Sequence, residues 1–180
     1  MKTQQKSTVT AGQILPVMRI LAWVGLVAFL IEAGALLFTY GVSFINPEAA
    51  QNLYKGLNLY ELRRFNFWYY TSSVSLLASL ALMKAWISFL VIKTLSGFNL
   101  QNPFTVQVAS RLEQISHVAF GMWVLAMIHN GHLAWLMKLT GTLHGSAISG
   151  EFIFMVGLVF IISQVFKRGV EIQSENELTV

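Results

Sequence analysis

Apolar residues are concentrated in four blocks, which cover residues 20–42, 70–92, 115–137 and 147–166. A bilayer core of about 30 Å requires roughly 20 residues of α-helix, so each block is long enough to cross it. The blocks lack the alternation of polar and apolar residues that the strands of a membrane barrel show. Because lipid offers no partner to an unpaired backbone group, the pattern predicts an all-α integral membrane four-helix bundle.

Basic residues are more frequent on the side of the membrane that would hold both chain ends. That side would also hold the loop over residues 93–114 and the tail over residues 167–180. Seven basic residues lie there: Lys2, Lys6, Arg19, Lys93, Arg111, Lys167 and Arg168. Four lie on the other side, which includes the loop over residues 43–69: Lys55, Arg63, Arg64 and Lys138. Cytoplasmic segments carry the excess of basic residues, so we predict a multi-pass protein of the inner (plasma) membrane with both termini cytoplasmic and 43–69 as an outer loop.

The composition supports this assignment. Hydrophobic residues make up 55% of the 180 residues, charged residues only 11%, and the mean hydropathy is +0.60. A soluble domain usually carries about 25% charged residues. We therefore expect a single membrane domain over residues 1–180, with the lipid bilayer as its first partner.

Charge and residue usage exclude several classes of function. The net charge is +4, but the basic residues are scattered singly or in pairs, so we expect no direct binding of nucleic acid. The absence of cysteine excludes disulfides and thiolate metal sites. The chain also lacks aspartate, a phosphate loop and a Ser-His-acid signature. We expect no enzymatic activity and no cofactor, whereas the sequence leaves a homo-oligomer open.

Two ionisable residues lie deep within predicted spans, Glu32 in the first and Lys84 in the second. A charge near the bilayer centre costs at least about 2.5–3.5 kcal/mol, which favours pairing. Counted from the cytoplasmic ends of their helices, the two depths differ by roughly 6 Å, within reach of the two side chains. We predict an intramembrane ion pair; a snorkelling lysine with a protonated glutamate, or a proton or ion pathway, are the alternatives.

Histidines gather toward the outer ends of the third and fourth spans. His129 and His132 are three residues apart and share a helical face, and His144 and Glu151 follow. Such a set is a weak candidate for a metal site, because the HExxH motif is missing and two glycines interrupt the spacing. Ordinary loop histidines are the simpler interpretation.

The loops carry helix signals. Residues 46–48 (Asn-Pro-Glu) predict a helix start in the outer loop, and the aromatic residues of segment 65–70 indicate an interfacial belt. On the other side, Gly97 predicts a helix end, and Asn102-Pro103 predicts the next helix start. Apolar residues at helical spacing follow: Phe104, Val108, Leu112 and Ile115. This stripe either lies on the lipid surface, packs against the C-terminal tail or docks a partner.

Two segments of the chain resemble signatures of a known family. The first is segment 102–105 (NPFT), and the second runs from QVFKRG at 164–169 to ENELTV at 175–180. Both are similar to signatures of the bacterial membrane family called domain of unknown function 2975. The likeness in topology covers about residues 15–180, although Glu177 stands where many relatives have aspartate. The resemblance implies four spans and no assigned chemistry. It also implies a gene neighbour, a small helix-turn-helix protein of the Cro/repressor type.

These observations lead to two hypotheses of function. The first is a regulatory protein that sequesters or signals to a small cytosolic helix-turn-helix transcription factor. Its binding surface would combine the apolar stripe with the acidic tail: Phe104, Val108, Leu112, Glu171, Glu175 and Glu177. The alternative is a small transporter or an ion- or proton-conducting protein that uses Glu32 and Lys84.

Overall fold

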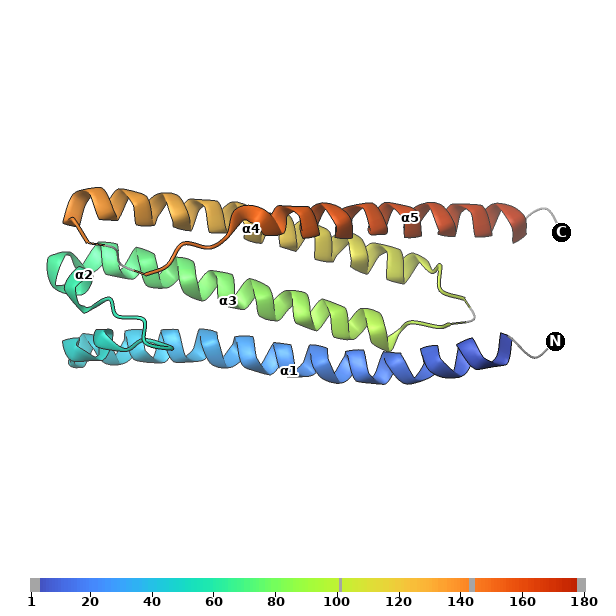
Figure 1. Cartoon of the computed structure of the whole chain (residues 1–180), viewed down its shortest axis with the longest axis horizontal. Helices are drawn as coiled ribbons and strands as arrows, with labels where there is room; N and C mark the ends of the chain where they lie inside the picture. The colour runs from blue at the N-terminus through green and yellow to red at the C-terminus, as the bar shows by residue number, and fades with distance from the viewer. Residues whose placement is uncertain (1–3, 101, 143–144, 178–180) are drawn as a thin grey trace. The chain divides into compact units, whose positions relative to one another are not determined.

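The computed structural model describes residues 4–100, 102–142 and 145–177, and within these ranges the side chains of residues 14–175. All regular structure in these ranges is helical. The elements are α1 (Gln4–Ile45), η1 (Pro47–Gln51), α2 (Tyr60–Phe65), α3 (Phe67–Ser96), α4 (Val106–Thr140), η2 (Gly150–Phe152) and α5 (Ile153–Glu177) (Figure 1). The expected all-α class is confirmed for the part of the chain that the structure describes.

Within the described residues, three helical segments are long and apolar enough to cross a membrane: Ile14–Ile45, Phe67–Ser96 and Gly150–Glu175. Their most apolar windows have mean hydropathies of 2.3, 2.0 and 1.7. Only 6% of the window in α1 is buried within the protein, against 33% in α3. The apolar side chains of α1 therefore face outward along most of its length, as expected of a helix in lipid. The protein is a membrane protein.

The remaining long helix, α4, does not reach the same hydropathy, although it has 35 residues. The cause is the polar run His129-Asn130-Gly131-His132, which interrupts the apolar sequence of α4 near its C-terminal end. Three of the four predicted spans thus coincide with membrane-compatible helices. The fourth span, at residues 115–137, stays a prediction.

The described residues divide into two compact units. The first unit takes its residues from Met1–Leu26, Trp86–Phe120 and Ile153–Val180, and the second from Val27–Ala85 and Gly121–Phe152. The helices α1, α3 and α4 each contribute residues to both units.

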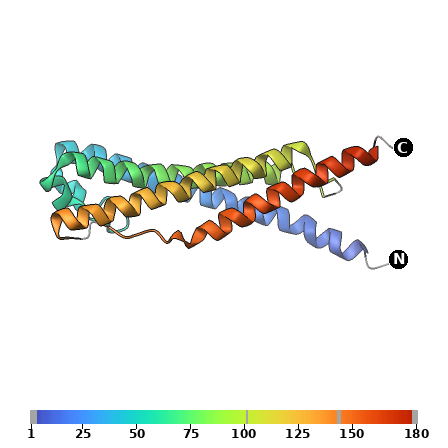
Figure 2. The same cartoon turned by 90° about the horizontal axis from the view of Figure 1, so that it is seen from above.

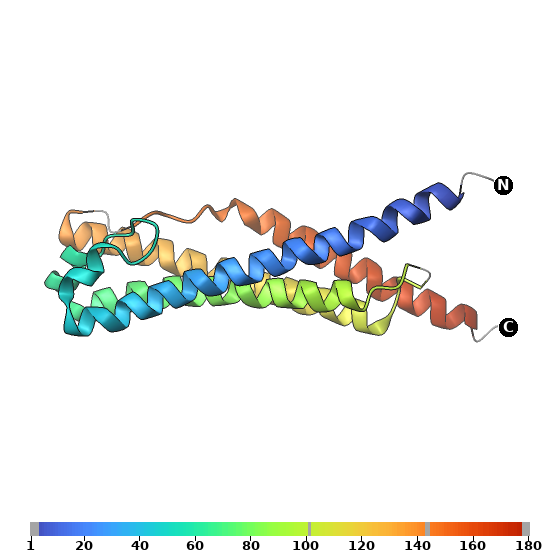
Figure 3. The same ribbon diagram turned by 90° about the horizontal axis from the view of Figure 1, so that it is seen from below.

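The second unit has a core of leucine and aromatic residues. Leu59 and Leu62, from the segment between η1 and α3, are buried together with Leu36 of α1, Tyr70 and Val74 of α3 and Leu136 of α4. Figures 1 and 3 show α2 beside the start of α3, with α1 running along α3 in this unit. The segment over residues 43–69 is therefore a folded part of the core, and it ties three helices together.

Tyr70 departs from the expected aromatic belt. Trp68 and Phe65 are exposed, as residues of a belt would be, whereas Tyr70 is fully buried. The Tyr70 hydroxyl donates a hydrogen bond to Ser43 Oγ at 3.1 Å, which satisfies its polar end inside the core. The interpretation of segment 65–70 as a belt is therefore wrong for Tyr70. Consecutive aromatic residues on a helix point in different directions, so Tyr70 can be buried while Trp68 is exposed.

The first unit brings together pieces of four helices. The early turns of α1, the end of α3, the start of α4 and the end of α5 lie toward one end of this unit (Figure 1). Arg19 of α1 donates to the carbonyl of Leu95 in α3 at 3.2 Å, and Arg111 of α4 donates to the carbonyl of Lys93. These two bonds join α1 and α4 to backbone carbonyls in the last turn of α3, where side chains often supplement the helical hydrogen bonds.

The helix boundaries follow most of the predicted signals. The Asn46 side chain accepts a hydrogen bond from the Glu48 amide and caps η1, and α3 ends at Ser96, just before Gly97. The expected start of a helix at Asn102-Pro103 is wrong. Thr105 caps α4 instead, because its hydroxyl accepts a hydrogen bond from the Val108 amide at 3.3 Å.

The two ends of α5 also differ from the expected bounds. Residues 146–149 lack helical structure, so the helix begins after residue 147, and α5 continues through most of the tail to Glu177. The connection from α4 runs back along α4 before α5 begins (Figures 1 and 2). Hydrogen bonds between the Asn130 side chain and the backbone of Ile148 hold the connection there, and a helix at this point would break them.

Candidate functional site

Two polar side chains in the second half of α4, Asn130 and His132, make contacts inside the second unit. His132 Nε2 lies 3.0 Å from Ser72 Oγ and 3.2 Å from Ser73 Oγ, both on α3. Asn130 donates to the Ile148 carbonyl at 2.7 Å and accepts from the Ile148 amide at 2.8 Å. The polar run that lowers the hydropathy of α4 is therefore used in contacts with α3 and with the connection to α5.

His129 is the exception among these groups. Its side chain is only 2% exposed, and neither ring nitrogen has a hydrogen-bond partner among the described residues. The backbone of Ser146 lies near the ring but outside hydrogen-bond geometry. An imidazole always carries at least one N–H donor, and a buried donor or acceptor without a partner costs about 1–3 kcal/mol. Buried polar groups in proteins are almost always satisfied, so this ring is unusual.

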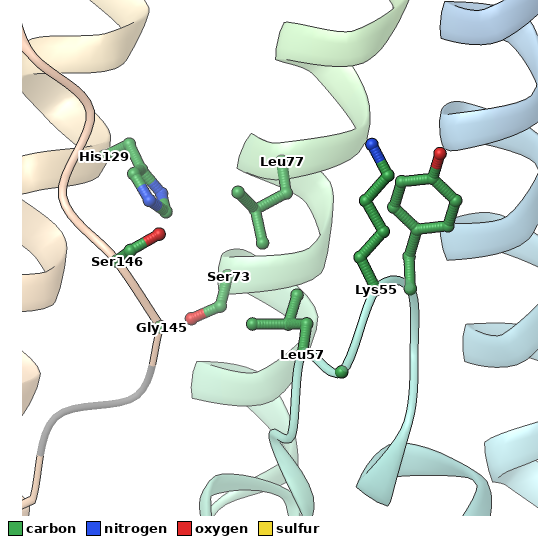
Figure 4. Close-up of a pocket in the computed structure, with 9 residues that line it drawn as sticks. Lys55, Leu57, Ser73, Leu77, His129, Gly145 and Ser146 are labelled. Atoms are coloured by element: carbon green, nitrogen blue, oxygen red, sulfur yellow. The ribbon is translucent and has the colours of Figure 1, made fainter.

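His129 lines a cavity of about 380 Å³ within the second unit. The other lining residues come from α3, from the loop after η1 and from the connection after α4 (Figure 4). They are Tyr54, Lys55, Gly56, Leu57, Ser73, Leu77, Gly145 and Ser146. Figure 4 shows His129 and Ser146 on one side, Ser73, Leu57 and Leu77 in the middle, and Lys55 on the other side. The volume lies in the range of small-molecule sites in proteins.

A tight turn holds Lys55 at this cavity. The Leu57 amide donates to the Tyr54 carbonyl at 2.9 Å, and the two residues between them have positive φ, 47° at Lys55 and 80° at Gly56. Positive φ is unusual for a residue with a side chain, and lysine is not a typical residue for this position of a turn. The Lys55 ammonium lies 5.2 Å from the centroid of the Tyr54 ring, which fixes it beside an aromatic face.

The metal candidates are not brought together as a ligand set. His129 faces the cavity, His132 is engaged with serines of α3, and Glu151 is exposed on η2. His144 lies outside the described residues. Within residues 4–100, 102–142 and 145–177, no group of three or more His, Cys, Asp or Glu side chains is arranged to hold a metal.

Glu32 and Lys84 are brought together in the second unit. Lys84 Nζ lies 3.4 Å from Glu32 Oε1, and the two side chains are 36% and 25% exposed for Lys84 and Glu32 respectively. The Lys84 ammonium also lies 5.6 Å from the centroid of the Phe29 ring. Glu32 and Phe29 are three residues apart on α1, so one face of α1 offers both a carboxylate and an aromatic ring to the lysine.

The two segments that resemble the family signatures meet in the first unit. The Phe104 ring packs against the Phe166 ring with a centroid distance of 5.2 Å, and it lies directly over Gly169. A Cβ atom at Gly169 would overlap this ring, at 2.8 Å from Phe104 Cε1. The NPFT-like and FxxG-like segments thus form one contact, in which the phenylalanine needs the glycine.

The remaining residues of the predicted docking surface differ from one another in how far they are buried. Val108 is buried at 2% exposure, and Leu112 is half-buried. Glu171 is exposed and pairs with Arg168 at 2.7 Å, and Glu175 is exposed. The side chain of Glu177 lies outside the described residues. These positions favour the alternative in which the tail packs on the stripe, because Phe104 and Val108 make their contacts within the chain.

Comparison with known proteins identifies the family. A family model described as "Protein of unknown function (DUF2975)" matches residues 58–180. The chain belongs to this family. The resemblance indicated by the two signature segments is therefore confirmed. The DUF2975 match includes Ser73, His129 and Ser146 of the cavity, but not Lys55. No curated protein and no solved structure matches the chain.

Sequence reasoning missed most of the cavity. His129 was recognised only as a weak metal candidate, whereas Ser73, Lys55 and Ser146 had no signal of their own. The glycine of Lys55-Gly56 indicates a turn at this point, since glycine readily adopts the positive φ that such turns require. Nothing in the sequence indicates that this turn lies beside His129, which is more than 70 positions away in the chain.

Proposed function

We propose that this DUF2975 protein is a multi-pass protein of the bacterial inner membrane in which α4 forms a fourth span. The supporting observation is the direction of two polar residues of α4, since His132 contacts α3 and Asn130 contacts the connection to α5. Polar side chains in a membrane helix face the bundle interior, where partners satisfy them. With four spans, both termini share one side, and the distribution of basic residues places that side in the cytoplasm.

On this topology the protein is a non-enzymatic regulatory partner of a small cytosolic helix-turn-helix protein. The observation that carries the proposal is the cavity of about 280 Å³ between the start of α4 and the end of α5. Val106, Ala109 and Val170 form its apolar part, and Glu113 and Glu171 lie at its polar part together with Ser110 and Lys167. It adjoins the Phe104–Gly169 contact, so the family signatures build the surface rather than bind the partner directly.

Charge complementarity selects the partner. Glu113 and Glu171 lie 3.7 Å from Lys167 and 2.7 Å from Arg168, respectively, and Glu175 adds an exposed carboxylate beside these two ion pairs. Val106 and Ile172 are 70% and 48% exposed and add apolar area at the same end of the unit. An apolar groove with acidic groups suits the basic, DNA-contacting surface of a helix-turn-helix domain. Binding there would compete with DNA and hold the regulator at the membrane.

The test replaces Glu171 and Glu175 together by Gln and measures how much of the neighbouring regulator fractionates with the membrane. Exposed charges contribute up to about 1 kcal/mol each, so the double variant should bind the regulator about tenfold more weakly. Transcription from promoters controlled by the regulator should change in the same cells. The matched control is Glu48→Gln with Glu61→Gln, two exposed glutamates on the predicted outer loop.

The outcomes separate regulation from a purely structural tail. If the control and the double variant retain the regulator equally, the acidic surface is not the docking site. If the chain retains no regulator at any salt concentration, the regulatory function is wrong. Wild-type and variant protein must be present in the membrane in equal amounts, which immunoblotting of the same fractions establishes.

A further inference from the structure

We propose that the cavity around His129 binds a small organic anion with an apolar body, a site independent of the regulatory proposal. The residues that line the cavity include one cationic residue, Lys55, and no carboxylate. Its wall includes Leu57 and Leu77, and its hydrogen-bonding groups are His129, Ser73 and Ser146 (Figure 4). A carboxylate at Lys55, an apolar middle against the leucines and a hydroxyl at His129 would match these groups in order.

The main evidence for a ligand is the state of His129. Its ring is almost completely buried, lines the cavity, and has no partner for either nitrogen among the described residues. The nearby His132 shows the ordinary alternative, since its Nε2 lies within hydrogen-bond distance of two serine hydroxyls. His129 lies in the wall of the cavity beside the same serine-rich helix, and neither ring nitrogen is paired within the described residues, so a ligand bound in the cavity would give the ring a partner.

The second piece of evidence is the position of Lys55. The turn that carries it requires positive φ at two successive residues, and the Leu57 amide closes it at 2.9 Å. An exposed lysine with no structural task would fit more easily in an extended loop. Here the turn places Lys55 in the wall of the cavity, where a positive charge attracts an anion and disfavours a cation.

The experiment uses three related probes with the full-length protein in mild detergent or lipid nanodiscs. The first is 4-hydroxybenzoate, which carries both polar ends on an apolar ring. The second is 4-hydroxybenzamide, which has the same shape without the charge, and the third is benzoate, which lacks the hydroxyl. Isothermal titration calorimetry measures the affinity of each. We expect 4-hydroxybenzoate to bind about tenfold more tightly than either of the others.

Two variants locate the binding site. Lys55→Gln should weaken 4-hydroxybenzoate about tenfold and leave 4-hydroxybenzamide unchanged, because only the carboxylate uses the charge. His129→Leu should reduce the affinity for 4-hydroxybenzoate to that for benzoate. The matched control is Lys138→Gln, which removes an exposed cation of α4 outside the cavity and should have no effect.

Each other result contradicts the proposal. Equal affinity for the acid and the amide means that the cavity does not select an anion. Binding that neither Lys55→Gln nor His129→Leu affects lies elsewhere, in the detergent or on the lipid-facing surface. No binding of any probe at millimolar concentration indicates that the cavity holds only water. Since Lys55 is exposed, its variant is expected to fold, and the anion test does not depend on the stability of the His129 variant.

Discussion

Gly169 and Phe104 show how a single residue determines how closely the segment before α4 packs against α5. The ring of Phe104 occupies the space that any side chain at position 169 would need. In the same helix, Gly157 has open space around it, with no atom within 4 Å of a built Cβ. A side chain can therefore be added at Gly157 but not at Gly169, although both glycines lie in the interior of α5.

We predict that Gly169→Ala destabilises the protein, whereas Gly157→Ala stabilises it or has no effect. Alanine is favoured over glycine in a helix by about 1 kcal/mol, so open space at residue 157 leaves that gain intact. Overpacking against Phe104 should cost about 1–3 kcal/mol at residue 169. The free energy of unfolding in mild detergent measures both. Adding Phe104→Ala should remove most of the penalty, and an undiminished penalty would show that the contact with the ring is not its cause.

The Glu32–Lys84 pair supports a second prediction at the residue scale. Glu32→Gln and Lys84→Met should each destabilise the protein by about 1–3 kcal/mol, because each leaves one charge unpaired in the membrane. The double variant should be less destabilised than the sum of the two. Thermal unfolding of all four proteins measures the coupling, and Glu32→Gln combined with Lys138→Met serves as the additive control. Additive effects for the Glu32–Lys84 pair itself would rule out a structural ion pair.

Residue-level contacts were predictable where helix geometry determines them. The proximity of Glu32 and Lys84 follows from counting residues along two helices, since the rise per residue is constant. The Phe104–Gly169 contact was open among alternatives, because a stripe of apolar residues has the same spacing on lipid, on the tail or on a partner. His129 faces a cavity that sequence could not reveal, since its walls come from four separate segments.

At the scale of elements, the connection between α4 and α5 shows a helix start delayed by tertiary contacts. Residues 147–149 belong to an apolar run and were expected to be helical, but Asn130 bonds both backbone groups of Ile148. Trp123 Nε1 donates to the Gly150 carbonyl at 3.1 Å, just before α5. A side chain that hydrogen-bonds backbone groups outside a helix competes with helix formation. Here the bonds from Asn130 keep the backbone of Ile148 out of a helix. Local sequence does not contain this information.

We predict that Asn130→Ala loosens this connection without unfolding the protein. The substitution removes two hydrogen bonds to Ile148, so its amide should exchange with deuterium at least about tenfold faster. Asn46→Ala is a suitable control, because it removes a cap of η1 and leaves the connection untouched. Hydrogen exchange with mass spectrometry resolves both segments. Unchanged exchange at Ile148 in Asn130→Ala would mean that the bonds do not hold the connection.

At the scale of the whole molecule, the pattern of apolar blocks predicts where the helices lie in the sequence. It does not predict which residues of the connecting segments are buried between them. Within the described residues, the apolar blocks lie in α1, α3, α4 and α5, because apolar runs of this length have few other structures in lipid. The segment over residues 43–69 was expected to be a loop that closes with an aromatic belt, yet Leu59 and Leu62 of this segment are buried in a core with Tyr70 of α3. Leu59 and Leu62 are buried by contacts with α1 and α4, and these helices lie too far away in the sequence for a local pattern to indicate the contacts.

The central claim is that α4 crosses the membrane and that both termini are cytoplasmic. The chain has no cysteine, so a single introduced cysteine reports its own side of the membrane through labelling by an impermeant maleimide. We predict that Gln51→Cys and Thr142→Cys are labelled from outside in spheroplasts, whereas Leu100→Cys is labelled only after the membrane is opened. A cysteine added after Val180 should behave like Leu100→Cys. Labelling of residues 100 and 142 from the same side would contradict the four-span topology and, with it, the cytosolic docking surface.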